Sequence, residues 1–162
     1  MGRTRRRVIR AIVVGLAAGA LLTAGKSLTA QNTGGSRFVG SSACAACHPE
    51  EYKSYLKYAR KANSYAGVAK MRPKLTPEEY QGCLGCHSTG YGEPGGFRSE
   101  EETPELKNAG CEVCHGPGGR HVVTADAADI GGRLSRQVCE RCHSQERVEA
   151  FQFKPLIYGG AH

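Results

Sequence analysis

The stretch Cys111-Glu112-Val113-Cys114-His115 places two cysteines three positions apart and a histidine directly after the second one. The same pattern occurs four times in the 162-residue chain, and together the four copies use all eight cysteines. Only six residues of the chain are histidine, so four histidines directly after cysteine pairs are not a chance arrangement. The copies occupy residues 44–48, 83–87, 111–115 and 139–143, and they are called the first to fourth motifs below.

Cys-x-x-Cys-His is the attachment signature of c-type haem. Two thiols three residues apart lie on one side of a helical turn, where both can add to the vinyl groups of one porphyrin edge. The next imidazole then ligates the iron as the proximal ligand. The sequence therefore predicts four covalently attached haem c groups. The predicted thioether residues are Cys44, Cys47, Cys83, Cys86, Cys111, Cys114, Cys139 and Cys142, and the predicted proximal ligands are His48, His87, His115 and His143.

Two alternatives for the cysteines are a disulfide framework and zinc sites made from cysteine pairs. Neither alternative explains the four histidines. Haem also accounts for the composition, because the chain has no Trp, only 7% aromatic residues and 22 glycines, and so has few large side chains for a core. The predicted fold class is mainly α, with short helices and loops wrapped around four stacked haems and little or no β structure.

The first 30 residues have the order of a secretory signal, with five arginines before an uncharged run from Ala11 to Gly25 and small residues up to Ala30. The alternative is an uncleaved membrane anchor, although the run is shorter than the ~20 residues of a spanning helix. We predict a signal peptide over 1–30, a flexible linker over 31–38 and a tetrahaem domain over 39–162. The expected location is periplasmic or otherwise exported, with membrane attachment only where the leader is retained.

The formal net charge of +7 arises mostly in this leader. Six of the 22 basic residues and none of the 15 acidic residues lie within residues 1–30, which leaves residues 31–162 with a net charge of +1. Nucleic acid is therefore not an expected partner. Eight haem propionates, at about −1 each, would make the holoprotein net negative, which favours redox partner proteins with a basic surface.

Only two histidines, His121 and His162, remain as distal ligands after the four proximal ones. We expect His121 to reach a neighbouring haem, because the short tether from His115 barely spans the edge of its own porphyrin. His162 ends the chain after an aromatic and aliphatic run from Phe151 to Tyr158, which favours its docking as a ligand. The remaining irons could take Met71, Lys61 or a histidine from a second molecule, or they could stay open.

The segments between the motifs predict few regular elements. Helical spacing of apolar residues after Pro49 predicts one helix up to about Ala66, ended by Gly67. Thr76-Pro77-Glu78-Glu79 predicts a capping box that leads into the second motif. Residues 88–103 are typical of a solvated loop, and a short helix from Leu134 is expected to lead into the fourth motif.

Beyond the motifs, the sequence resembles the tetrahaem cytochrome c554 family (the cytochrome c552/c554 domain) from about Val39 to the C-terminus. The resemblance rests on Val39-Gly40-Ser41-Ser42-Ala43-Cys44, on Cys83-Leu84-Gly85-Cys86-His87-Ser88-Thr89-Gly90-Tyr91, on Gly110-Cys111-Glu112-Val113-Cys114-His115-Gly116-Pro117-Gly118 with His121 after it, and on the closing segment from Phe151-Gln152-Phe153 to His162.

The resemblance implies a mainly helical fold around closely stacked haem pairs, periplasmic electron transfer, and one high-spin haem with an open axial position. Relatives often carry a distal histidine in a Ser-x-His-Ala string after the first motif, whereas this chain has Ala59-Arg60-Lys61-Ala62 there. The family ligand set of seven histidines is therefore one short. Lys61, a second open haem or a partner chain would have to make up the difference.

The sequence thus favours an exported tetrahaem electron carrier between respiratory redox partners. The first alternative is a haem enzyme that converts a small nitrogen species, such as nitric oxide, hydroxylamine or nitrite, at an open iron. The second alternative is an extracellular conduit in which self-associated chains exchange axial histidines.

Overall fold

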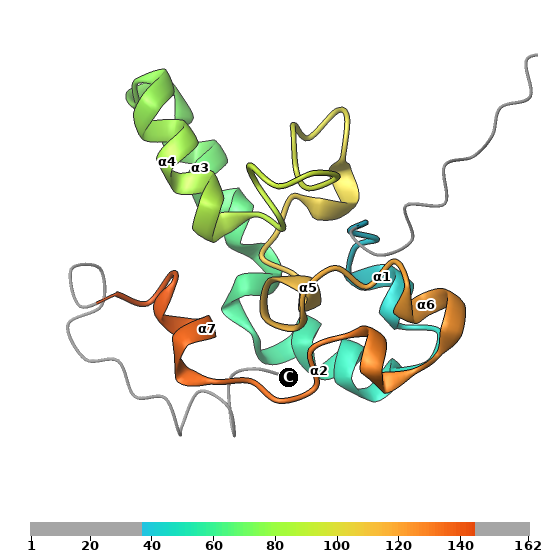
Figure 1. The fold of residues 1–162 in the computed structure, drawn as a ribbon. Coiled ribbons are helices and arrows are strands. Elements are labelled where there is room, and N and C mark those ends of the chain that lie inside the picture. The colour runs from blue at the N-terminus through green and yellow to red at the C-terminus, as the bar shows by residue number, and fades with distance from the viewer. Residues whose placement is uncertain (1–36, 145–162) are drawn as a thin grey trace, which may run out of the picture. The chain divides into compact units, whose positions relative to one another are not determined.

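The computed structural model describes residues 37–144 (Figure 1). Within this range the chain forms short helices and turns and no β-strand, which confirms the mainly α fold class. The α-helices are α1 (Ser41–Cys44), α2 (Pro49–Tyr58), α3 (Ser64–Met71), α4 (Pro77–His87), α5 (Cys111–His115), α6 (His121–Thr124) and α7 (Arg136–Glu140). The 3-10 helices are η1 (Arg60–Asn63), η2 (Arg72–Lys74), η3 (Pro104–Leu106) and η4 (Ala127–Asp129).

Helix α4 begins at the capping box that the sequence predicted. The Thr76 hydroxyl accepts the Glu79 N–H at 3.2 Å, and the Thr76 N–H donates to the Glu79 carboxylate at 2.8 Å. Pro77 is the first helical residue, a position where the N–H it lacks would have no intrahelical partner. The helix ends at His87, so the second motif forms its last turns.

The prediction of one helix from Pro49 to about Ala66 is wrong. Helix α2 ends at Tyr58, the buried Ala59 is extended, and α3 starts at Ser64 after η1. The break turns the chain so that the Ser64 hydroxyl can donate to the carbonyl oxygen of His87 at 2.9 Å. Gly67 lies inside α3, where glycine costs about 1 kcal/mol relative to alanine. Tertiary contacts thus override the apolar periodicity at this point.

The main hydrophobic cluster forms where α3 and α4 pack side by side (Figure 1). Tyr65 and Val68 of α3 and Leu84 of α4 are joined there by Phe38, Phe97 and Leu106. The Tyr65 and Phe97 rings meet edge to face with centroids 5.6 Å apart. Phe97 is only 2% exposed, so residues 88–103 are a loop with a buried anchor and not the fully solvated loop that the sequence predicted.

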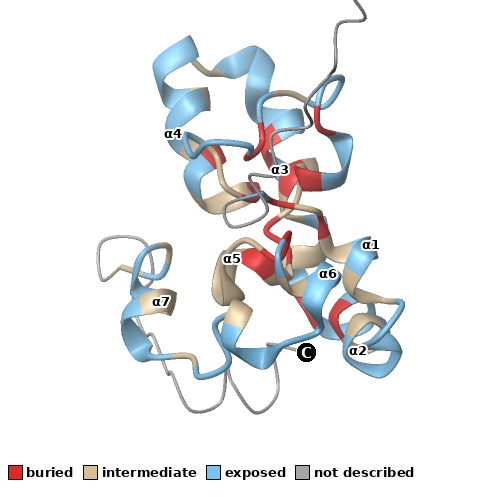
Figure 2. Ribbon diagram, turned by 45° about the vertical axis from the view of Figure 1, so that its right-hand side comes forward, coloured by how far each residue is buried: buried red, intermediate tan, exposed pale blue. Residues whose placement is uncertain are grey.

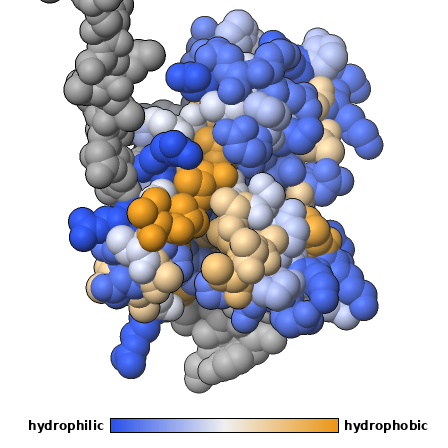
Figure 3. Space-filling model, turned by 90° about the vertical axis from the view of Figure 1, so that its right-hand side faces the viewer, coloured by the Kyte–Doolittle hydropathy of each residue, from blue (hydrophilic) through white to orange (hydrophobic). Residues whose placement is uncertain are grey.

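This core is small for the number of residues that the structure describes. Nine apolar residues are buried within residues 37–144, and α1, α6 and α7 contribute none of them (Figure 2). Several large apolar side chains of the same part stay exposed, and Figure 3 shows a compact hydrophobic group on an otherwise largely hydrophilic face. The exposed ones are Leu56, Tyr58, Met71, Val122 and Val123. Three of the helices that carry or adjoin motifs therefore add no buried side chain to this core.

The approach to the fourth motif is shorter than expected. Helix α7 starts at Arg136, two residues after the predicted start, and ends at Glu140 between the two cysteines of the motif. No helix of the part that the structure describes has the length and apolar character needed to cross a membrane. The leader over 1–30 and the closing segment with His162 lie outside the described residues.

Candidate functional site

Each of the four motifs folds as a helical turn. In the first and fourth motifs, which leave their helices part-way, the histidine N–H still donates to the carbonyl of the first cysteine, at 2.8 Å for His48 and 2.9 Å for His143. The second motif lies at the end of α4, and the third motif is α5 itself. This turn brings the two thiols of each motif to one side, as attachment to one porphyrin edge requires.

All eight cysteines are free thiols in the described residues, and seven of them are half-buried. Neither alternative from the sequence gains support here: no cysteine forms a disulfide, and the described residues contain no group of three or more His, Cys, Asp or Glu side chains that could hold a metal ion. The thiols are instead distributed along four separate turns.

Thiols of different motifs meet in two pairs. Cys44 of the first motif donates a hydrogen bond to Cys111 of the third, which lowers the pKa of Cys111 to about 6 and raises that of Cys44. Burial, with a hydrogen bond to Cys86 of the second motif, raises the pKa of Cys142 in the fourth motif to about 12. The first motif therefore contacts the third, and the second contacts the fourth.

Two of the four motif imidazoles are oriented by backbone carbonyls. The Nδ1 atom of His87 lies 3.0 Å from the carbonyl oxygen of Ser64, and Nδ1 of His115 lies 2.6 Å from that of Gly131. A carbonyl can only accept, so Nδ1 carries the proton and Nε2 is the basic nitrogen of the neutral ring. Metal-bound histidines are typically held in this way. The donor set therefore fits a metal ligated through Nε2.

His121 is held in the same manner and lies beside the first motif. Its Nδ1 donates to the carbonyl of Asp126 at 2.9 Å. The rings of His48 and His121 have centroids 6.2 Å apart and planes inclined by 27°. Two imidazoles on opposite sides of one metal ion have centroids about 6 Å apart, because each metal–nitrogen bond is about 2 Å and each nitrogen lies about 1 Å from its ring centre. The observed spacing matches this value.

A buried carboxylate, which was not predicted as a functional group, lies inside the third motif. Glu112 is 2% exposed and accepts three backbone N–H groups: that of Val39 on both oxygens at 3.0 and 3.1 Å, that of Gly40 at 2.8 Å and that of Gly118 at 2.7 Å. These bonds tie the entry to α1 and the turn after His115 to the same side chain. A charged residue between two motif cysteines was the only available signal.

Ser64 connects the second and third motifs. Its hydroxyl donates to the His87 carbonyl and accepts the N–H of Ala109, both at 2.9 Å, while its own carbonyl holds the His87 ring. Ala109 leads directly into the third motif and accepts the Tyr55 hydroxyl at 3.3 Å. Burial is the main reason why the pKa of Tyr55 rises to about 12. Ser64 was not predicted as a functional residue, because no distinctive motif surrounds it in the sequence.

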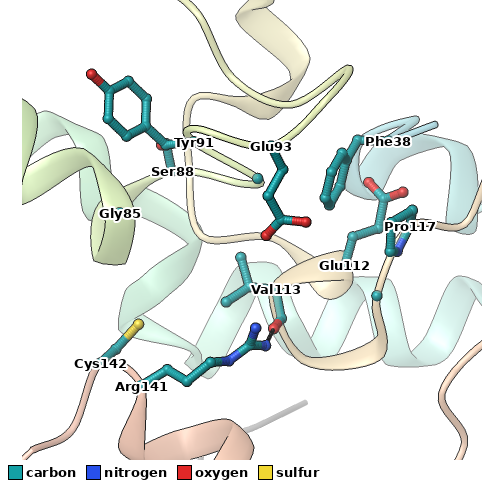
Figure 4. A pocket seen from close by; sticks show the side chains of 12 residues that line it. Phe38, Gly85, Ser88, Tyr91, Glu93, Glu112, Val113, Pro117, Arg141 and Cys142 are labelled. Atoms are coloured by element: carbon teal, nitrogen blue, oxygen red, sulfur yellow. Dashed lines mark hydrogen bonds between the residues drawn. The ribbon is translucent and has the colours of Figure 1, made fainter. Parts of the chain in front are cut away.

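A hollow of about 180 Å³ lies between segments of the second, third and fourth motifs. Figure 4 shows the Glu93 carboxylate directed into it and Arg141 extended toward the carbonyl of Val113, to which it donates at 2.9 Å. Gly85 and Cys142 bring the second and fourth motifs to its wall. The hollow is therefore part of the region where the motifs converge.

The remaining candidate ligands differ in their surroundings. Lys61 is half-buried on η1, and its positive charge opposes the rise that burial causes in the pKa of Cys139 in the fourth motif. Met71 is 48% exposed at the end of α3. His143 is exposed in the turn after α7. His162 lies outside the described residues.

Four helical turns that each carry two thiols and a histidine, with the His87 and His115 rings held through Nδ1, define a multihaem c-type cytochrome. The family described as cytochrome c554 and c-prime matches residues 43–116, and the sequence is 35% identical over 139 residues to cytochrome c-554 of Nitrosomonas europaea. The chain belongs to the cytochrome c554 family. The alignment covers 75% of this chain and 57% of the relative, so the chain spans little more than half of that protein.

The fold agrees with this assignment. A solved structure of reduced cytochrome c554 from Nitrosomonas europaea superimposes with a TM-score of 0.56 at 22% identity, and the match covers 78% of this chain and 85% of the other. The described helices thus share the fold of that cytochrome.

Proposed function

We propose that the chain binds four haem c groups, one on each motif, and carries electrons between redox proteins outside the cytoplasm. Haem iron supplies one-electron transfer by alternating between the ferric and ferrous states. Support comes from the family membership, the four turns that carry the cysteine pairs, and the small core, to which α1, α6 and α7 contribute no buried residue.

The proximal ligands are His48, His87, His115 and His143, each the last residue of its motif. For His87 and His115, the carbonyls of Ser64 and Gly131 fix the ring so that Nε2 is the basic nitrogen. A hydrogen bond from Nδ1–H to a carbonyl also makes Nε2 more basic, and so a stronger ligand for iron. This favours the ferric state.

His121 is the distal ligand at the first motif and not at its own, the third. The 6.2 Å separation from the His48 ring is the single observation that carries the electron-transfer function, because an iron closed by two imidazoles can pass electrons but cannot bind a substrate. The sequence predicted a neighbouring haem as the target of His121, and the geometry supports the first motif.

The thiol contacts support an arrangement of the haems in two pairs. Cys44 meets Cys111, and Cys86 meets Cys142, so the porphyrin edges attached at these residues would start from adjacent points. Electrons would pass readily between the haems of the first and third motifs, and between those of the second and fourth. This proposal agrees with the stacked pairs that the family resemblance implied.

The ligand set of the other irons follows from the histidine count. Six histidines provide four proximal ligands, His121 and His162, so at least two irons lack a second histidine from this chain. His162 remains the proposed distal ligand at another motif. Lys61, near the fourth motif, and Met71 remain secondary candidates.

The proposed setting is the periplasm, reached with the secretory leader, and the partners are redox proteins with basic surfaces. Mass spectrometry of the mature protein tests the cofactor count, with four haem masses expected and a smaller number contradicting it. Low-temperature EPR of the oxidised holoprotein, with and without nitric oxide, tests the function. A carrier leaves most haem low-spin and unreactive, whereas two or more irons that bind nitric oxide would favour the enzyme alternative. High-spin signal that appears only on dilution would favour a conduit.

A further inference from the structure

The short helix α6 ends in an unusual backbone conformation close to His121. Ala125 has φ of 55° and ψ of 17°, and it is the only non-glycine residue with positive φ between residues 37 and 144. Its N–H donates to the His121 carbonyl at 2.7 Å. The left-handed region disfavours residues with a side chain, so surrounding contacts must hold the chain in this turn.

The turn brings the next residue back to the imidazole. Directly after Ala125, the Asp126 carbonyl accepts the Nδ1–H of His121 at 2.9 Å. The Asp126 carboxylate caps η4 by accepting the Ala128 N–H at 2.9 Å, and the Asp126 N–H donates to the Thr124 hydroxyl at 3.2 Å. The carbonyl that orients His121 is thus part of a connected set of hydrogen bonds.

Asp129 closes this set across the base of the turn. One carboxylate oxygen accepts the Thr124 hydroxyl at 2.7 Å, and the other lies 2.7 Å from Nε of Arg120. The Asp129 side chain is only 14% exposed in this pair. Hydrogen bonding from Thr124, followed by Arg120, lowers its pKa, so the carboxylate is ionised near neutral pH. The residues on both sides of His121 are therefore braced by one carboxylate.

The far end of the segment is fixed as well. The Gly131 N–H donates to the His115 carbonyl at 2.8 Å, and the Gly131 carbonyl accepts Nδ1–H of His115 at 2.6 Å. A methyl group on Gly131 would lie 2.9 Å from the His115 carbonyl oxygen, so the contact admits no larger residue without a shift. Residues 125–131 hence supply the carbonyl acceptors of two imidazoles and are anchored at both ends.

We propose that residues 125–131 form a ligand-holding segment, in which the Ala125 turn and the Arg120–Asp129–Thr124 contacts position His121 so that it stays bound to the iron at the first motif. The inference rests on the proposed role of His121 as a ligand. Asp129 is a positioning residue, since its carboxylate bonds to Arg120 and Thr124 and would contact neither the iron nor the His121 nitrogen that binds it. Loss of these contacts, called the brace below, raises the equilibrium constant for release of His121 from the iron.

The test is competition with exogenous imidazole, followed by EPR and optical spectra of the oxidised holoprotein. In Asp129→Ala, the imidazole concentration that half-replaces His121 should fall about tenfold, since an ion pair and a hydroxyl contact are lost together. Asp129→Asn keeps an accepting oxygen and should lie between the two. Glu102→Ala is the matched control, because it removes another Arg–carboxylate pair, with Arg98, outside the segment.

Two variants at position 125 give an independent measurement. Ala125→Val places a β-branched side chain in the left-handed turn and should also ease replacement of His121, whereas Ala125→Gly suits the conformation and should titrate like the native protein. Haem content and far-UV circular dichroism establish that each variant is folded. If Asp129→Ala and Ala125→Val both require the native imidazole concentration, the inference is overturned.

His121→Ala separates this inference from the proposed function. It should convert one haem to a form that binds imidazole without competition. If it opens no haem, His121 is not a ligand, and both proposals fail together. If it opens one haem while the brace variants behave as native, the ligand assignment stands and only the ligand-holding role is lost.

Discussion

Glu112→Ala should be the most destabilising single change within the third motif that leaves all cysteines and histidines in place. The native carboxylate is 2% exposed and accepts the N–H groups of Val39, Gly40 and Gly118, with no cation among its hydrogen-bond partners. Alanine leaves these donors without an acceptor. Gly40 and Gly118 are buried, whereas Val39 is half-buried and can be hydrated.

The expected loss follows from those two buried donors. A buried donor that loses its partner costs about 1–3 kcal/mol, so two of them cost about 2–6 kcal/mol. The native state also bears the penalty of burying a carboxylate. Because alanine removes that penalty, the net loss of stability is smaller than the cost of the two unpaired donors. We therefore expect Glu112→Ala to lower the free energy of unfolding by about 3 kcal/mol, and the thermal midpoint by about 10 °C for a domain of this size.

Guanidinium unfolding of the oxidised holoprotein, followed by far-UV circular dichroism, measures this loss. Glu112→Gln keeps one accepting oxygen but turns the other into a donor, so it should lose about half as much as alanine. Glu101→Ala is the control, because that exposed loop carboxylate should change stability by no more than about 0.5 kcal/mol. If Glu112→Ala falls within 0.5 kcal/mol of this control, the carboxylate does not tie the entry segment to the motif, and the reasoning is refuted.

Three further predictions concern the α3–α4 region and the loop after it. Thr76→Ala removes the capping box and should cost about 1 kcal/mol in thermal unfolding, while Thr76→Ser should retain most of that stability. Gly90→Ala should cost several times as much as Gly92→Ala in the same assay: both glycines have positive φ, but only at Gly90 would the added carbon lie 2.6 Å from the Phe38 ring. The hydrogen bond to Tyr80 raises the pKa of Tyr65 to about 12, so the unfolded chain releases this proton near pH 10 before the native state does, and stability should fall between pH 10 and 12 by up to about 2–3 kcal/mol. Tyr65→Phe should flatten that fall in guanidinium midpoints measured from pH 9 to 12, and an unchanged pH dependence would contradict the assignment.

The local structure at the helix cap and at the haem motifs was predictable, because short sequence motifs determine it. The capping box at Thr76 and a helical turn at each Cys-x-x-Cys-His string depend only on residues that are neighbours in the sequence. The break at Ala59 was not predictable, because the apolar spacing that favours one continuous helix runs through it. The alternative conformation is selected by a distant partner, the His87 carbonyl that Ser64 reaches after the break.

The part of the site that sequence reasoning missed has one physical origin. His87, His115 and His121 are each oriented by a backbone carbonyl, supplied by Ser64, Gly131 and Asp126. Every residue type carries a carbonyl, so an acceptor of this kind leaves no mark on the sequence. Glu112 is the converse case: the side chain is the acceptor, and its donors are backbone N–H groups, which also leave no mark on the sequence. Residues that bond covalently to a cofactor must have a particular chemistry and can be read directly. Residues that position those groups need only a particular place in the fold, and for this chain that place becomes visible only once Ala125 turns the segment back toward His121.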